Sequence, residues 1–312
     1  MSRRARILFF GSVLSLGCEP PSGGSEAAEG EREAEPSALY AEDSASASYP
    51  APPMTFSSAP TASASAAAVL EVSRCPAEPP VLLRRPTLSD EALRQAMKDK
   101  TALLGAASLG EPNKGNLFAG VELKANEHLE RSGKHGFGTE LTVRSLERAA
   151  REVARCHPGG PKVHVGDISA ERGGWITPHR SHQSGLDADV GFYYRTGSAW
   201  YVAPTREMLD IERTWTFLRA LIEGGGVEVV FLDLRIQRML HDVARAAPPQ
   251  GWKLENVFDL EHHKDKLLRH EYGHATHLHV RFSDPWARSL GARVVALDPT
   301  GALRGAPKRV KR

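Results

Sequence analysis

The segment His277-Leu278-His279-Val280-Arg281-Phe282 alternates polar and apolar side chains. This alternation predicts a β-strand, because successive side chains of a strand point to opposite faces. The three apolar residues would then pack into a core, while His277 and His279 would lie side by side on the other face. The segment therefore predicts a sheet that carries a site built around two neighbouring imidazoles.

A second segment, far upstream, supplies further groups of the kind that bind metal ions: Ser181-His182-Gln183-Ser184-Gly185-Leu186-Asp187-Ala188-Asp189. His182 offers an imidazole and Asp189 offers a carboxylate. Together with His279 they form a set of two histidines and one carboxylate, which leaves the fourth position of a tetrahedral zinc ion open for water. We therefore expect a zinc ion (Zn2+) bound by His182, Asp189 and His279.

The two segments together resemble the motifs of the penicillin-insensitive murein endopeptidases, written here as His179-x-Ser181-His182-Gln183-x-Gly185-Leu186-Asp187-x-Asp189 and His274-x-x-His277-x-His279. That family belongs to a superfamily with the lysostaphin-type peptidases, the D-Ala-D-Ala metallopeptidases and the hedgehog amino-terminal domain. The similar sequence begins near Ser108, passes through Gly166-Asp167-Ile168-Ser169 and ends about Phe282. It therefore covers a little over half of the chain.

The other histidines of these motifs have candidate roles beside the metal. His277 is expected to be a general base or a group that stabilises the transition state, because an imidazole titrates near neutral pH. His274 would orient the substrate or complete the hydrogen-bonded shell around the ligands. His179 is either a further metal ligand or a hydrogen-bond donor to the ligands. Ser181 and Gln183 are expected to contact the peptide, and Asp187 is expected to accept hydrogen bonds behind the ligands. The alternative is that these residues only hold the loop by hydrogen bonds.

The resemblance implies hydrolysis of peptide cross-links in peptidoglycan, at the bond between D-alanine and diaminopimelate. Zinc would activate a water molecule for this D,D-endopeptidase reaction, and a histidine would transfer the proton. Catalysis by an activated serine is not expected, because the chain has neither a G-x-S-x-G nor an S-x-x-K motif.

Two alternatives to this function remain open. The first is a D,D-carboxypeptidase or an L,D-endopeptidase that acts on the same polymer. The second is a non-catalytic lipoprotein that binds the cell wall and uses zinc only for stability. His274 and His277 argue against the second alternative, because a structural zinc ion usually has four protein ligands.

The stretch His270-Glu271-Tyr272-Gly273-His274 raises another possibility, since it matches the H-E-x-x-H motif of zincin proteases. That motif requires a helix, on which the two histidines share one face. Gly273 weakens a helix by about 1 kcal/mol. The alternating residues that follow also predict a strand rather than a longer helix, so we favour a loop here.

The amino terminus has the features of an export signal. Three arginines precede an apolar run over residues 7–16, and Ser15-Leu16-Gly17-Cys18 follows. This ending resembles a bacterial lipobox, in which Cys18 would be lipidated; the alternative is a plain secretory signal. We therefore expect a periplasmic protein that is anchored to the membrane by an amino-terminal lipid.

The remaining composition divides the chain into four parts. We expect a signal peptide over 1–18, a disordered tether rich in Ala, Ser, Pro and Glu over 19–75, a zinc endopeptidase domain over 76–295, and a basic carboxy-terminal tail over 296–312. The whole chain has 312 residues, 41% of them hydrophobic, and a net charge of only +2. This balance gives no indication of nucleic-acid binding.

Besides Cys18, the chain contains Cys75 and Cys156. In an exported protein such a pair suggests one disulfide, although two buried thiols are the alternative.

Helices and strands are expected to be mixed without a regular βαβ order. The periodicity predicts helices over 89–104, 139–157, 206–222 and 236–246, and strands over 162–168, 187–194, 227–232 and 277–282. This order predicts an α+β fold, with a small, mainly antiparallel sheet flanked by helices. The resemblance adds that a zinc site of the hedgehog and D-Ala-D-Ala-peptidase type should lie on the sheet.

Overall fold

The computed structural model describes residue 75 and residues 77–83, 85–99, 105–197, 199–263, 265–301 and 303. The predicted signal over 1–18, with Cys18, and residues 19–74 of the predicted tether lie outside the described residues, as does most of the predicted basic tail. Among the helices of the described part, none is long and apolar enough to cross a membrane.

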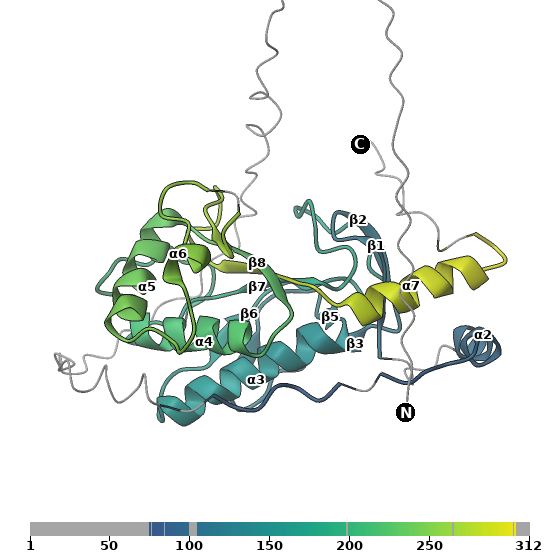
Figure 1. Ribbon diagram of the computed structural model, residues 1–312, viewed down its shortest axis with the longest axis horizontal. Helices are drawn as coiled ribbons and strands as arrows, with labels where there is room; N and C mark the ends of the chain where they lie inside the picture. The colour runs from purple at the N-terminus through teal and green to yellow at the C-terminus, as the bar shows by residue number, and fades with distance from the viewer. Residues whose placement is uncertain are drawn as a thin grey trace, which may run out of the picture. The chain divides into compact units, whose positions relative to one another are not determined.

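A six-stranded sheet forms the centre of the domain (Figure 1), in the order β4-β6-β7-β10-β8-β9. Its inner pairings, β6 with β7, β7 with β10 and β10 with β8, are antiparallel, whereas the two outer pairings are parallel. The prediction of an α+β fold with a mainly antiparallel sheet is therefore confirmed. The strands span Leu129–Arg131 (β4), Val163–Val165 (β6), Asp187–Val190 (β7), Val227–Phe231 (β8), Leu268–Arg269 (β9) and Leu278–Phe282 (β10).

Two small sheets accompany the main one, and the sequence pattern did not predict them. A hairpin pairs β1 (Ala107–Glu111) with β2 (Lys114–Phe118), and β3 (Val121–Glu122) pairs with β5 (Phe137–Gly138). These strands are short and rich in glycine, so they lack an alternation long enough to be recognised. Gln183 attaches the hairpin to the loop before β7, since its side-chain amide donates to the carbonyl of Asn113 at 2.9 Å.

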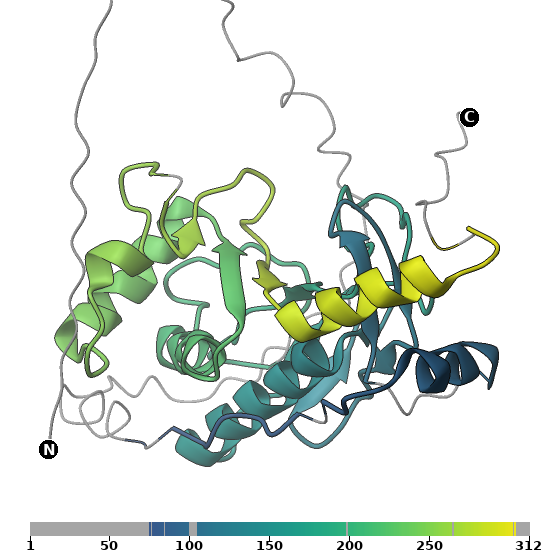
Figure 2. The ribbon, with the colours of Figure 1, turned by 45° about the vertical axis from the view of Figure 1, so that its right-hand side comes forward.

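The described helices surround this sheet. In Figures 1 and 2, α3 and α4 lie below the sheet, α5 and α6 lie at one end of it, and α7 and α2 lie at the other end. They span Asp90–Asp99 (α2), Glu140–Cys156 (α3), Ile211–Glu223 (α4), Leu234–Ala246 (α5), Leu254–Val257 (α6) and Pro285–Leu297 (α7).

The helix boundaries follow from local capping. Thr139 caps α3 by accepting a hydrogen bond from the backbone N–H of Thr142 at 3.3 Å, as the predicted start required. Asp210 caps α4, so this helix begins at Ile211 and not at the predicted residue 206. Helix α7 was not predicted, although Asp284 followed by proline is a typical helix start.

The two faces of the central strands have different surroundings. Ala188 and Val190 of β7 and Leu278 and Val280 of β10 belong to the main hydrophobic core, which also includes residues of α3 and α4. Because side chains alternate along a strand, the polar residues between them lie on the opposite face. Packing of the helices against one face therefore leaves the other face free for the site.

The start of the described chain runs along α3 as an amino-terminal strap, residues 77–83. Cys75 and Cys156 form a disulfide, as predicted. Beside it, the backbone N–H of Glu78 donates to Glu152 Oε2 at 3.1 Å, and Arg148 Nε donates to the carbonyl of Pro79 at 2.9 Å. The strap is thus attached to the helices both covalently and by hydrogen bonds.

Candidate metal centre and active site

Strands β7 and β10 place a carboxylate and an imidazole opposite each other. His279 of β10 pairs in register with Asp189 of β7, and the two side chains project from the same face of the sheet. Asp189 Oδ1 lies 3.2 Å from His279 Nδ1. Both side chains are almost fully buried. The antiparallel register therefore brings together two groups that are far apart in the sequence.

His182 joins this pair from the loop that precedes β7. Its Nδ1 lies 2.9 Å from the carbonyl oxygen of Ile168. A carbonyl only accepts hydrogen bonds, so Nδ1 must carry the proton and Nε2 presents its lone pair. That Nε2 lies 3.3 Å from Asp189 Oδ1 and 3.3 Å from His279 Nδ1. His182 Nε2, Asp189 Oδ1 and His279 Nδ1 thus form a nearly equilateral triangle.

Asp189 Oδ1 is buried and makes no hydrogen bond within the described residues, although imidazole nitrogens surround it. A buried carboxylate oxygen normally has a hydrogen-bond or ionic partner. The chemistry of this group of donor atoms therefore suits a bound cation.

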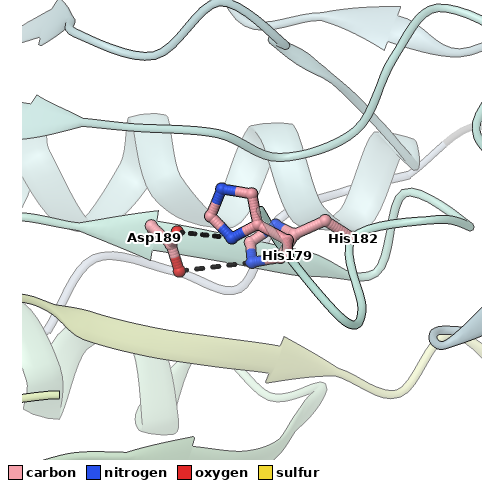
Figure 3. Close-up of side chains that lie close together, drawn as sticks. All are labelled: His179, His182 and Asp189. Atoms are coloured by element: carbon pink, nitrogen blue, oxygen red, sulfur yellow. Dashed lines mark ion pairs between the residues drawn. The ribbon is translucent and has the colours of Figure 1, made fainter. Parts of the chain in front are cut away.

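His179 lies beside His182, with ring centroids 4.4 Å apart, and faces the second oxygen of the same carboxylate. Figure 3 shows the imidazoles of His179 and His182 next to Asp189, and these three residues form a group that could hold a metal ion. His179 Nδ1 is 3.6 Å from Asp189 Oδ2, and its Nε2 is 3.2 Å from Oδ2 of the buried Asp167. His179 therefore bridges two carboxylates, which is compatible with either of its predicted roles.

His277 and His274 lie beside these groups. His277 Nε2 is 3.5 Å from Asp189 Oδ1, and its Nδ1 is 3.1 Å from the hydroxyl of Thr276. The ring centroid of His274 is 5.1 Å from that of His277 and 5.5 Å from that of His279. The structure thus brings together all six predicted histidine and carboxylate groups, while their roles as ligands or catalytic residues stay predictions.

Burial and neighbouring charges shift the pKa values of these residues in different directions. Burial by itself would raise the pKa of Asp189, but His182 and His277 hold it well below the ordinary value. Burial would lower the pKa of His279, but Asp187 and Asp189 raise it to about 9. Burial lowers the pKa of His277 to about 4, so that this imidazole is neutral at pH 7.

The buried carboxylate of Asp187 forms an ion pair with Arg281 behind the candidate metal ligands. Arg281 donates to both carboxylate oxygens of Asp187, at 2.7 Å and 3.1 Å, and the backbone N–H of His182 also donates to Asp187 at 3.1 Å. Asp187 Oδ1 lies 3.6 Å from His279 Nε2. Arg281 was missed as a site residue. Its position two residues after His279 places it on the same face of the strand, but its contact with Asp187 arises from the register with β7.

Gln183 and the stretch that matches the H-E-x-x-H motif both have roles in holding loops. Gln183 is buried and holds the loop by hydrogen bonds, including the one from its amide to Asn113. Residues 270–274 form a turn and no helix, and Gly273 has a φ of +86°. His270 accepts from the backbone N–H of Leu234 at 3.0 Å. The H-E-x-x-H alternative is therefore wrong, because its two histidines do not share a helix face.

Comparison with known proteins agrees with the resemblance, and the family match includes the first of the two motifs. A family model described as penicillin-insensitive murein endopeptidase matches residues 108–219, which include His179, His182 and Asp189. A protein of Haemophilus influenzae named penicillin-insensitive murein endopeptidase is 25% identical over 221 residues. The aligned part is 65% of this chain and 68% of that protein.

Proposed function

Because the chain belongs to the penicillin-insensitive murein endopeptidase family, we propose that it is a zinc-dependent D,D-endopeptidase of peptidoglycan. Membership of the family indicates a murein endopeptidase. The proposal adds that the bond cut lies between D-alanine and diaminopimelate and that the reaction depends on zinc. It also assigns a role to each residue of the site. The observation that carries it is the triangle formed by His182 Nε2, Asp189 Oδ1 and His279 Nδ1.

The dimensions of this triangle support zinc. Its edges measure 3.3, 3.2 and 3.3 Å. A tetrahedron whose corners lie about 2.0–2.1 Å from a central zinc ion has edges of about 3.3–3.4 Å. His182, Asp189 and His279 would therefore hold the ion and leave the fourth position free. His179 would then act through its contacts with Asp167 and Asp189.

Zinc, when bound, would polarise the scissile carbonyl and lower the pKa of a water molecule toward neutrality. His277 is neutral at pH 7 and has Nε2 directed toward the ligand triangle, so it is suited to accept the proton of that water molecule. The same imidazole, once protonated, would donate to the leaving amine. Burial lowers the pKa of His274 to about 3, so His274 would remain neutral and orient the peptide by hydrogen bonding.

The place of action is also part of the proposal. A peptidoglycan hydrolase meets its substrate only outside the cytoplasmic membrane. The positively charged start, the apolar run and Cys18 support export and a lipid anchor in the periplasm.

The test is digestion of cross-linked muropeptide dimers by the purified protein, followed by mass analysis of the products. We expect monomers with a free D-alanine carboxylate, no cleavage in the presence of a chelator, and recovery after addition of zinc. Release of a terminal D-alanine would indicate a D,D-carboxypeptidase, and cleavage at an L,D bond would indicate an L,D-endopeptidase. Tight zinc binding without any cleavage would favour the wall-binding protein.

A further inference from the structure

Tyr201 lies against His277 in an unusual backbone conformation. The two rings are stacked, with centroids 5.1 Å apart and planes inclined by 20°. Tyr201 has a φ of +60°, in the left-handed region that bulky side chains rarely adopt. Such a conformation costs free energy and persists only where the surrounding structure holds it.

Trp200 holds this conformation on the amino-terminal side. Its indole is buried and packs over two glycines that follow the central strands β6 and β7. A Cβ atom built on Gly166 would lie 2.3 Å from the indole, and one built on Gly191 would lie 3.3 Å from it. Its Nε1 has no hydrogen-bond partner within the described residues, so shape and not hydrogen bonding places the ring.

The carboxy-terminal side is held by a hydrogen bond. The hydroxyl of Tyr194 donates to the carbonyl of Val202 at 2.5 Å. Tyr194 is itself buried and bridges to Leu209. Tyr201 is therefore fixed between two anchored neighbours, and the strained residue between them presents its ring to His277.

The ring of His277 also lies beside that of His274, whose centroid is 5.1 Å away and whose plane is tilted by 41°. One nitrogen of His277 lies 3.1 Å from the hydroxyl of Thr276, and the other lies 3.5 Å from Asp189 Oδ1. These contacts act at the edge of the imidazole, whereas the stacked ring of Tyr201 covers one face. A stacked aromatic ring restricts rotation about the side-chain bonds without adding a charge.

We propose that Tyr201 is a positioning residue, which holds the imidazole of His277 in the orientation that proton transfer requires. This inference rests on the proposed function of His277. The left-handed φ and the stacking occur together at this one residue. The hydroxyl is not needed for this role, because the stacking depends on the ring alone.

Two substitutions distinguish the effect of the aromatic ring from the effect of the backbone conformation. Tyr201→Phe keeps the ring, and we expect its kcat to stay close to that of the unaltered chain. Tyr201→Gly removes the ring but accepts the left-handed φ readily. We expect this variant to fold at least as stably and to bind as much zinc. Its kcat should fall by about 10- to 100-fold with little change in KM, which is the scale of a small misplacement of a catalytic group.

A second measurement does not depend on turnover. In protein with isotope-labelled histidines, the stacked ring of Tyr201 should shift the carbon-bound protons of His277 upfield in NMR spectra. Tyr201→Phe should keep the shift and Tyr201→Gly should lose it; His277→Gln identifies the signals. If the unaltered chain cleaves no muropeptide, the proposed function fails, but these spectra still test the stacking. An unchanged kcat in Tyr201→Gly, or an unchanged shift of His277, would overturn the positioning role.

Discussion

Replacing Arg281 with methionine would leave Asp187 buried without its cationic partner. Arg281 makes two hydrogen bonds to a carboxylate that is fully buried, while the arginine side chain itself is only 22% exposed. Burial by itself would raise the pKa of Asp187, but His279 and Arg281 hold it well below the ordinary value. The substitution therefore removes one of the cations that keep this carboxylate ionised.

The loss can be estimated from the burial of the pair. Removal of one partner of a buried ion pair costs about 3–5 kcal/mol of folding stability. Arg281 is partly exposed, so we expect the lower end of this range. Asp187 also contacts His279 Nε2 and the backbone of His182. We therefore expect zinc affinity to fall as well, by about 10- to 100-fold, as for other residues that orient metal ligands.

Urea unfolding of metal-free protein and competition for zinc with a chromophoric chelator would measure the two effects. Arg288→Met is a matched control, since Arg288 is similarly exposed but pairs at 3.1 Å with Glu111, whose carboxylate side chain is 67% exposed. We expect that control to cost less than about 1 kcal/mol. The double variant Arg281→Met with Asp187→Asn should recover part of the loss, because its buried group is neutral. Equal losses for the two arginine variants would refute the reasoning.

Further expectations concern the metal, the proton, the core and the anchor. His279→Ala should abolish zinc binding and turnover while Glu271→Gln leaves both nearly intact, as metal analysis and muropeptide digestion would show; full zinc occupancy in His279→Ala would contradict the ligand set. His277→Ala should keep zinc but slow hydrolysis at least about 100-fold in kinetics on the same preparation. Burial and then Arg213 lower the pKa of His157 to about 4. Because the unfolded chain protonates this group near its ordinary pKa of about 6.5, stability should be complete above that pH and fall by up to about 3 kcal/mol as the pH drops toward 4. Urea titrations at several pH values should give a flatter profile for His157→Gln. Cys18→Ser should release the protein from membranes in cell fractionation, and a mature amino terminus well beyond Cys18 would exclude the anchor.

Much of the central architecture could be predicted from local patterns. Thr139 and the apolar stripe after it are sufficient to place α3, and the alternation around His279 is sufficient to place β10. The start of α4 was wrong because the cap at Asp210, and not the periodicity, decides where the helix begins. The short strands β3, β4, β5 and β9 have two or three residues each, so their sequence carries no period. Their existence depends on pairing with distant segments.

The candidate site shows the same division. His182, Asp189 and His279 stand out because their spacing matches a motif. Arg281 and Tyr201 do not, since their contacts arise from strand register and loop packing. A single sequence contains no direct record of either, and only the folded chain places these side chains against Asp187 and His277.

The attachment of the amino-terminal strap has a mechanical consequence. Glu152 is fully buried between Arg148 and Arg219, and the disulfide from Cys75 ends on the same helix, α3. A pulling force that reached Cys75 from the residues before it would pass directly into α3 and its neighbour α4. These helices pack on the face of the sheet that is turned away from the histidines. Tension applied at Cys75 would therefore be borne by the scaffold, while the spacing of the clustered imidazoles and carboxylates stayed unchanged.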